Sequence, residues 1–147
     1  LGGYPHSKLF LNVREKASLA YYASSRLDGH KGIMTIQSGI EINQVDQATE
    51  IILKQIDAMK QGEISALELN QTRAMITNQL REIQDSAFDL IGYDFNRVMA
   101  GSGTADISGM IQALQQVEPD QIQQFAEQVE LDTVYFLSNL GKESNHE

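Results

Sequence analysis

Residues 13 to 21, VREKASLAY, place Arg14 and Tyr21 seven positions apart, and both side chains carry hydrogen-bond donors. Arg14 falls where a helical pattern ends, and Tyr21 falls where a strand pattern begins. Taken locally, Arg14 belongs to a solvated helix end, where arginines join only weak ion pairs. Tyr21 is locally a strand residue facing a core. Whether the pair forms a site depends on the rest of the sequence.

Histidine spacing offers no metal site. His6, His30 and His146 fall in a predicted helix start, a hairpin turn and the tail, with neither H-E-x-x-H nor H-x-x-E-H spacing. A hydrolytic zinc ion needs about three protein ligands, usually including two histidines from one helix. Cysteine is absent, which removes thiolate sites and disulfides. We therefore predict solvated histidines and no metal ligands in this chain.

The glycine-rich segment GSGTADISG, residues 101 to 109, also lacks a catalytic pattern. It contains no G-x-S-x-G nucleophile elbow and no phosphate-binding lysine. Its glycines follow a predicted helix instead of a strand, so a connector between helices is the favoured interpretation. No catalytic residue is predicted within the chain.

The elements that position Arg14 and Tyr21 follow from hydrophobic periodicity. Apolar residues at helical spacing predict a first helix that ends near Lys16 or Ala17. Two β-rich runs, residues 19 to 27 and 33 to 40, flank the turn sequence DGHKG. They predict an antiparallel hairpin.

Helices dominate the rest of the chain. Asn43 is the predicted N-cap of a helix that stops at Gly62. Ser65 and Glu68 form a predicted capping box that starts a long helix running to about Met99. Three further elements are predicted: a short helix carrying Met110 to Val117, a helix with Pro119 at its first position, and a last strand at 133 to 137.

This order predicts an α+β fold, an antiparallel sheet with several helices packed on one face. Residues 1 to 140 are expected to form one domain, and residues 141 to 147 a polar tail. Three strands make a thin sheet, so strands preceding Leu1 are expected to be missing. The unpaired edge of such a sheet invites self-pairing in a homodimer.

Charge and hydropathy exclude two classes of partner. Twenty acidic and eleven basic residues give a net charge of -9, which opposes binding to nucleic acid. No apolar run approaches the roughly 20 residues that span a bilayer, and residues 1 to 8 do not resemble a signal peptide. We expect a cytoplasmic, bacterial-type protein without a membrane partner.

The region SKLFLNVREKASLAYYASS resembles the signature of the pitrilysin family of zinc metallopeptidases, which includes insulin-degrading enzymes and mitochondrial processing peptidases. Non-zinc halves of that family carry a helix, an Arg-Glu-Lys-like triplet, a Leu-Gly/Ala-Tyr step and a strand. Here these are LFLNVREK, SLAY and YASS. The similarity continues through the hairpin, the glycine-separated helices and the closing strand, and implies a LuxS/peptidase-like half-domain.

The resemblance implies a substrate-contacting role. In this family one half carries an H-x-x-E-H zinc motif, and the other contributes an arginine and a tyrosine that match Arg14 and Tyr21. Guanidinium donors could bind a peptide carbonyl, and the phenol could stabilise an oxyanion. Zinc is implied for the partner half only. The implied partners are a zinc-bearing homologous domain or subunit and a peptide substrate, and the chain alone is expected to be inactive.

Two alternatives remain open from sequence. The first is a catalytically inactive homologue that holds a partner protein as a scaffold. The second is an unrelated α+β interaction module, in which Arg14 and Tyr21 would point to different faces.

Overall fold

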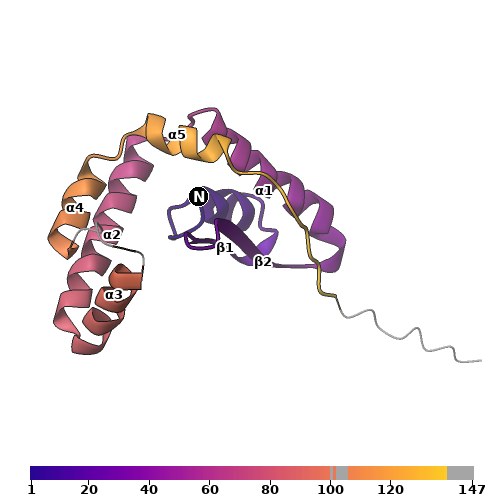
Figure 1. Ribbon diagram of the computed structural model, residues 1–147. Helices are drawn as coiled ribbons and strands as arrows, with labels where there is room; N and C mark the ends of the chain where they lie inside the picture. The colour runs from indigo at the N-terminus through magenta and orange to yellow at the C-terminus, as the bar shows by residue number, and fades with distance from the viewer. Residues whose placement is uncertain (100, 102–105, 139–147) are drawn as a thin grey trace, which may run out of the picture.

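The computed structural model describes residues 1–99, 101 and 106–138. The predicted tail at 141 to 147, His146 and most of the GSG connector lie outside these residues. The fold is α+β, with a hairpin near the middle of the molecule, α1 on one side, α2 to α4 on the other and α5 across one end (Figure 1). The elements are η1 (Phe10–Lys16), β1 (Ala20–Asp28), β2 (Ile33–Ile40), η2 (Ile42–Gln44), α1 (Val45–Lys60), α2 (Ala66–Asp85), α3 (Ala87–Met99), α4 (Ile107–Gln115) and α5 (Pro119–Glu127).

The predicted hairpin is confirmed. β1 and β2 pair antiparallel, with Asp28 opposite Ile33 next to the turn. The Asp28 carboxylate accepts hydrogen bonds from the backbone N–H groups of His30 and Lys31, at 3.1 and 3.2 Å. Gly32 takes a left-handed φ of 64°, which glycine adopts without steric cost. Local turn chemistry therefore closes the hairpin.

A small core joins η1 and β1 to α1. Val13 on the inner side of η1 and Leu9, its N-cap residue, are fully buried, and they pack with Leu19, Ala23 and Ala48. Partly buried side chains of β2 and α1 surround this cluster. The core thus fixes the position of η1 against the start of β1.

The predicted stop of α1 at Gly62 is confirmed. Gly62 has a φ of 76°, and its N–H donates to the Met59 carbonyl at 3.1 Å. The next N–H, from Glu63, donates to the Ala58 carbonyl at 2.9 Å. These two bonds form a Schellman motif, which satisfies carbonyls at a helix end.

The predicted capping box at the start of α2 is also confirmed. The Glu68 N–H donates to the Ser65 hydroxyl oxygen at 3.2 Å, and the Ser65 N–H donates to the Glu68 carboxylate at 2.9 Å. Lys8 adds an ion pair to Glu68 at 3.0 Å, which ties the segment before η1 to α2. Tyr4 extends this attachment through a hydrogen bond from its hydroxyl to Gln79 at 2.7 Å.

Loss of the Glu68 charge should weaken the protein in acid. Partial burial alone would raise the pKa of Glu68, but hydrogen bonds from Ser65 and the Lys8 ammonium outweigh that effect and lower the pKa below its usual 4.5. A lowered pKa contributes stability that is present at neutral pH and lost as pH falls below 4.5. We expect Glu68→Gln to reduce the drop in melting temperature between neutral and acidic pH. Glu63→Gln, at an exposed position nearby, should leave that drop unchanged; an equal effect of both variants would contradict the assignment.

The predicted long helix to Met99 is wrong, because it divides at Ser86. Ser86 is extended, with φ of -118° and ψ of 113°. Its hydroxyl oxygen accepts a hydrogen bond from the Asp89 N–H at 3.3 Å, as an N-cap does. Serine competes for backbone donors in this way, which ends α2 and starts α3.

The predicted N-cap at Asn43 is wrong as well. Asn43 lies inside the short η2 turn, and α1 begins at Val45 without a side-chain cap. The Gln44 N–H instead donates to the Glu41 carbonyl at 3.0 Å. A 3₁₀ turn of this kind supplies backbone bonds where a side-chain cap is missing.

The predicted strand at 133 to 137 does not form in the described structure, whose sheet has two strands. Val134, Tyr135 and Leu137 are exposed. A strand exists only where its backbone groups pair with a sheet edge, and this segment pairs with neither strand of the hairpin. The sequence pattern predicts a segment that could form a strand. It does not identify the sheet edge with which that strand would have to pair.

Candidate substrate-contact site

Arg14 lies on a short helix of uncommon geometry. η1 is a π-helix, whereas the sequence pattern predicted an ordinary helix over the same residues. Its inner side buries Val13, and its outer side exposes Arg14. Single-turn π-helices are rare and occur frequently at functional sites. Because Val13 is buried, the backbone of η1 that carries the exposed Arg14 is held against the core.

A strained residue ends η1. Ser18 has a φ of 51°, the left-handed region that few side chains other than glycine adopt. The following N–H, from Leu19, donates back to the Val13 carbonyl at 3.1 Å. Backbone strain of this kind persists where the surrounding structure enforces it and is common at functional sites. Here it turns the chain from η1 directly into β1.

Relief of this strain should stabilise the protein. We expect Ser18→Gly to raise the free energy of unfolding by about 0.5 kcal/mol, because glycine removes the Cβ clash at a positive φ but is more flexible when unfolded. Ser24→Gly, at an exposed position on β1, should lower it by a similar amount. Urea unfolding measures both, and a destabilising Ser18→Gly would contradict the proposed strain.

Tyr21 occupies a β-bulge. Ala20 pairs with Ile40 and Tyr22 pairs with Gly39, so Tyr21 has no partner on β2. Its side chain is 77% exposed, which corrects the local expectation that Tyr21 faces a core. Bulges re-aim side chains and occur often beside active sites. The bulge thus presents the phenol to solvent immediately after the η1 junction.

Arg14 is oriented by an aromatic neighbour. Its guanidinium carbon lies 4.6 Å from the centroid of the Phe10 ring, one helical turn earlier. Cation–π contact at an exposed site contributes about 0.5–1 kcal/mol and leaves the guanidinium edge open to hydrogen-bond acceptors. Both predicted residues therefore sit on the surface of one short segment, although their mutual orientation toward a substrate stays a prediction.

Tyr22 was not singled out from the sequence, and it lies beside the bulge. A Cβ at Gly39 would come within 2.7 Å of the Tyr22 ring, so the ring lies across the glycine on the neighbouring strand. Glycine within a strand commonly marks such a close approach. Tyr22 therefore packs against the neighbouring strand, while Tyr21 is mostly exposed.

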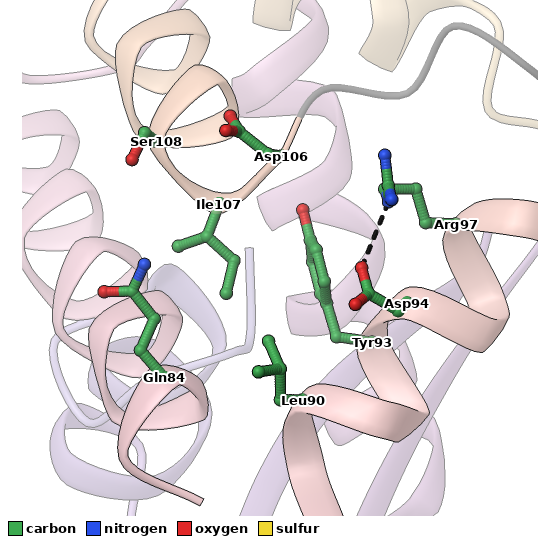
Figure 2. Close-up of a pocket in the computed structure, with 8 residues that line it drawn as sticks. All are labelled: Gln84, Leu90, Tyr93, Asp94, Arg97, Asp106, Ile107 and Ser108. Atoms are coloured by element: carbon green, nitrogen blue, oxygen red, sulfur yellow. Dashed lines mark hydrogen bonds and ion pairs between the residues drawn. The ribbon is translucent and has the colours of Figure 1, made fainter. Parts of the chain in front are cut away.

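A pocket of about 300 Å³ lies elsewhere, between α2, α3 and α4. Figure 2 shows Leu90, Tyr93 and Ile107 gathered there, with an Arg97–Asp94 hydrogen bond of 3.2 Å nearby. The other carboxylate, Asp106, caps α4 by accepting from the Gly109 N–H at 2.8 Å. The carboxylates of this pocket already have structural partners, which makes it a weaker candidate for chemistry than the η1–β1 junction.

The described residues offer no zinc site. No group of three or more His, Cys, Asp or Glu side chains could hold a metal ion in the described part of the chain. The His6 ring lies 3.4 Å from the Thr72 hydroxyl and stacks on Tyr4, and His30 lies in the hairpin turn. The residues present therefore do not fit zinc, and no catalytic step through a metal follows from them.

Residues 1–76, which include η1, both strands and α1, match the family described as "Peptidase M16 inactive domain". This match covers just over half of the chain. The chain belongs to the M16 peptidase family. The M16 assignment confirms the resemblance to pitrilysin-type peptidases and excludes an unrelated α+β module.

Three similar proteins are longer than this chain, and each matches it over part of its own length. A Bacillus subtilis (strain 168) protein named "Probable inactive metalloprotease YmfF" is 43% identical over 136 residues, which are 92% of this chain and 32% of that protein. A second, "Uncharacterized zinc protease YmxG", is 36% identical over 84 residues, 54% of this chain and 20% of that protein. A solved Enterococcus faecalis V583 structure, described as a conserved protein, has 38% identity and a TM-score of 0.79 over 86% of this chain and 30% of its own.

These coverages mean that the chain spans about a third, or less, of the proteins it matches. Within the described residues, no helix has the length and apolar content to cross a membrane.

Proposed function

We propose that this chain is the substrate-contacting, non-zinc part of a peptide-hydrolysing M16 assembly, and that it forms one domain over residues 1–140. Arg14 binds a peptide carbonyl of the substrate, and Tyr21 donates a hydrogen bond to the oxyanion that develops at the scissile bond. The zinc ion and its H-x-x-E-H ligands belong to another domain or chain.

The observation that carries this proposal is the η1–β1 junction. A π-helix anchored by the buried Val13, a left-handed Ser18 and a bulge at Tyr21 present two exposed donor side chains from one short segment. Preorganised donors of this kind contribute to catalysis because they need no rearrangement when charge develops.

The test is reconstitution with a homologous zinc-bearing M16 half. We expect the purified chain alone to leave a fluorogenic peptide uncut, and the mixture to cut it faster than the zinc half does alone. A mixture in which the two halves bind each other but hydrolysis equals that of the zinc half would overturn the substrate-contacting role.

A second candidate is a catalytically inactive scaffold that binds a partner protein. The name of the 43% identical relative, "Probable inactive metalloprotease YmfF", favours this alternative. It predicts that any homologous domain paired with this chain lacks H-x-x-E-H, and that the chain binds its partner equally well after Arg14→Ala.

A further inference from the structure

A network of hydrogen bonds ties η1 to α1 close to Arg14. The Asn12 Nδ2 group donates to the Lys8 carbonyl at 2.9 Å and to the Oε1 atom of Gln55, on α1, at 2.7 Å. Gln55 in turn donates from Nε2 to the Ile51 carbonyl at 3.3 Å. Asn12 and Gln55 are both partly buried. Their bond therefore joins the π-helix that carries Arg14 to the middle of α1.

The Asn12 amide uses both of its N–H groups and its oxygen. The two N–H groups donate to Lys8 and Gln55, and Oδ1 accepts from the Lys16 ammonium at 3.1 Å. A backbone carbonyl can only accept and an ammonium can only donate, so these partners fix which way round the amide lies. The Asn12 side chain is therefore held in one orientation by contacts at both ends of the amide.

Directional bonds add what the buried apolar residues of this region do not supply. Leu9 and Val13 hold η1 against the core, but the hydrophobic effect that stabilises such contacts has no preferred direction. A hydrogen bond, in contrast, weakens steeply when its angle departs far from linear. The Asn12–Gln55 bond thus specifies the orientation of η1 relative to α1, and with it the direction in which η1 presents Arg14.

We propose that Asn12 is a positioning residue of the substrate-contact site: its bond to Gln55 sets the orientation of η1 and so the direction of the Arg14 guanidinium. Asn12 acts through Arg14 and touches no reacting atom. The inference rests on the proposed function, because the direction of Arg14 matters to hydrolysis only if Arg14 binds substrate. Misplacement of a binding group by about 1 Å can cost on the order of 100-fold in rate, so a bond outside the site can have a large effect.

Hydrolysis by the assembly with a zinc-bearing M16 half gives the first test. Asn12→Leu keeps the approximate size of the side chain but removes its hydrogen bonds, and should raise KM by about 5- to 10-fold. It should leave kcat within about twofold, because Tyr21 and not Arg14 meets the developing charge. In an Arg14→Ala background the same change should alter KM by less than about twofold, since the two residues act as a unit. Asn70→Leu, the same change at an exposed position on α2, should leave both constants unchanged.

Two substitutions of Gln55 separate positioning from general stability. Gln55→Leu removes the acceptor of the Asn12 amide and should raise KM as Asn12→Leu does. Gln55→Glu keeps a carboxylate oxygen as acceptor and should keep KM within about twofold of the unchanged chain, although it loses the bond to Ile51. A residue that only stabilised the fold would lower the melting temperature without changing the KM of the folded assembly. Unchanged KM in both Asn12→Leu and Gln55→Leu, with KM raised in Arg14→Ala, would overturn the inference.

Residual dipolar couplings measured on the 147-residue chain test the orientation without any activity. The couplings of backbone N–H groups report the orientation of η1 relative to α1. We expect Asn12→Leu and Gln55→Leu to change the couplings of η1 relative to those of α1, and Gln55→Glu and Asn70→Leu to preserve them. Unchanged couplings in Asn12→Leu and Gln55→Leu would overturn the inference. If Arg14→Ala left hydrolysis unchanged, the proposed function would fail, whereas these couplings would still decide whether Asn12 orients η1.

Discussion

Changing Tyr21 to phenylalanine should lower peptide hydrolysis about 100-fold in an assembly of this chain with a zinc-bearing M16 half, because loss of one oxyanion donor typically costs a factor of that size. The loss should fall on kcat, since the phenol acts as charge develops. Tyr22→Phe removes the same hydroxyl from the neighbouring residue, whose ring packs across Gly39, and should leave kcat unchanged.

Arg14 should affect the same assembly differently. Arg14→Ala removes charge-assisted hydrogen bonds to a substrate carbonyl, worth about 1.5–3 kcal/mol, and should raise KM by roughly 10- to 100-fold. Arg14→Lys keeps the charge and should recover only part of that loss, because lysine lacks the planar fork. Equal effects of Tyr21→Phe and Tyr22→Phe, or wild-type turnover in Arg14→Ala, would contradict the assigned roles.

Leu9→Ala should be the most destabilising of the substitutions considered. Leu9 is 0% exposed and anchors η1 against the core beneath Arg14. Its truncation removes buried apolar area and leaves a cavity, at a cost of about 3 kcal/mol in the free energy of unfolding. Urea unfolding should show a lower midpoint with an unchanged slope.

Leu67→Ala is the matched control for this change. Leu67 is 66% exposed at the start of α2, so the same truncation should change the free energy of unfolding by less than about 0.5 kcal/mol. If Leu9→Ala cost no more than Leu67→Ala, the core described around η1 would not be what holds the junction in place.

The parts of the fold that sequence predicted well have local causes. The Ser65–Glu68 capping box and the glycine stop at Gly62 each depend on residues within one helical turn. The Ser86 break carried the same kind of signal, because Ser86 and Asp89 repeat the spacing of an N-cap and its acidic partner. The apolar residues at helical spacing on both sides of Ser86 favoured one continuous helix, so the N-cap spacing of Ser86 and Asp89 was not used in the prediction.

Other features depend on contacts that local sequence does not encode. The bulge at Tyr21 follows from the cross-strand register between β1 and β2, which no single strand pattern specifies. The segment at 133 to 137 has strand character but needs an edge partner. Arg14 and Tyr21 themselves came from a family resemblance, since neither residue differs locally from an ordinary surface arginine or strand tyrosine.

The most direct test of the account is photo-crosslinking at the η1–β1 junction. With Tyr21 or Arg14 replaced by p-benzoylphenylalanine, the assembly should cross-link a labelled, slowly hydrolysed peptide from both positions. The same replacement at Tyr135, which is 81% exposed on the C-terminal segment, should give no cross-link above background. Peptide labelling from positions 14 and 21 no stronger than from position 135 would contradict the claim that this junction contacts substrate.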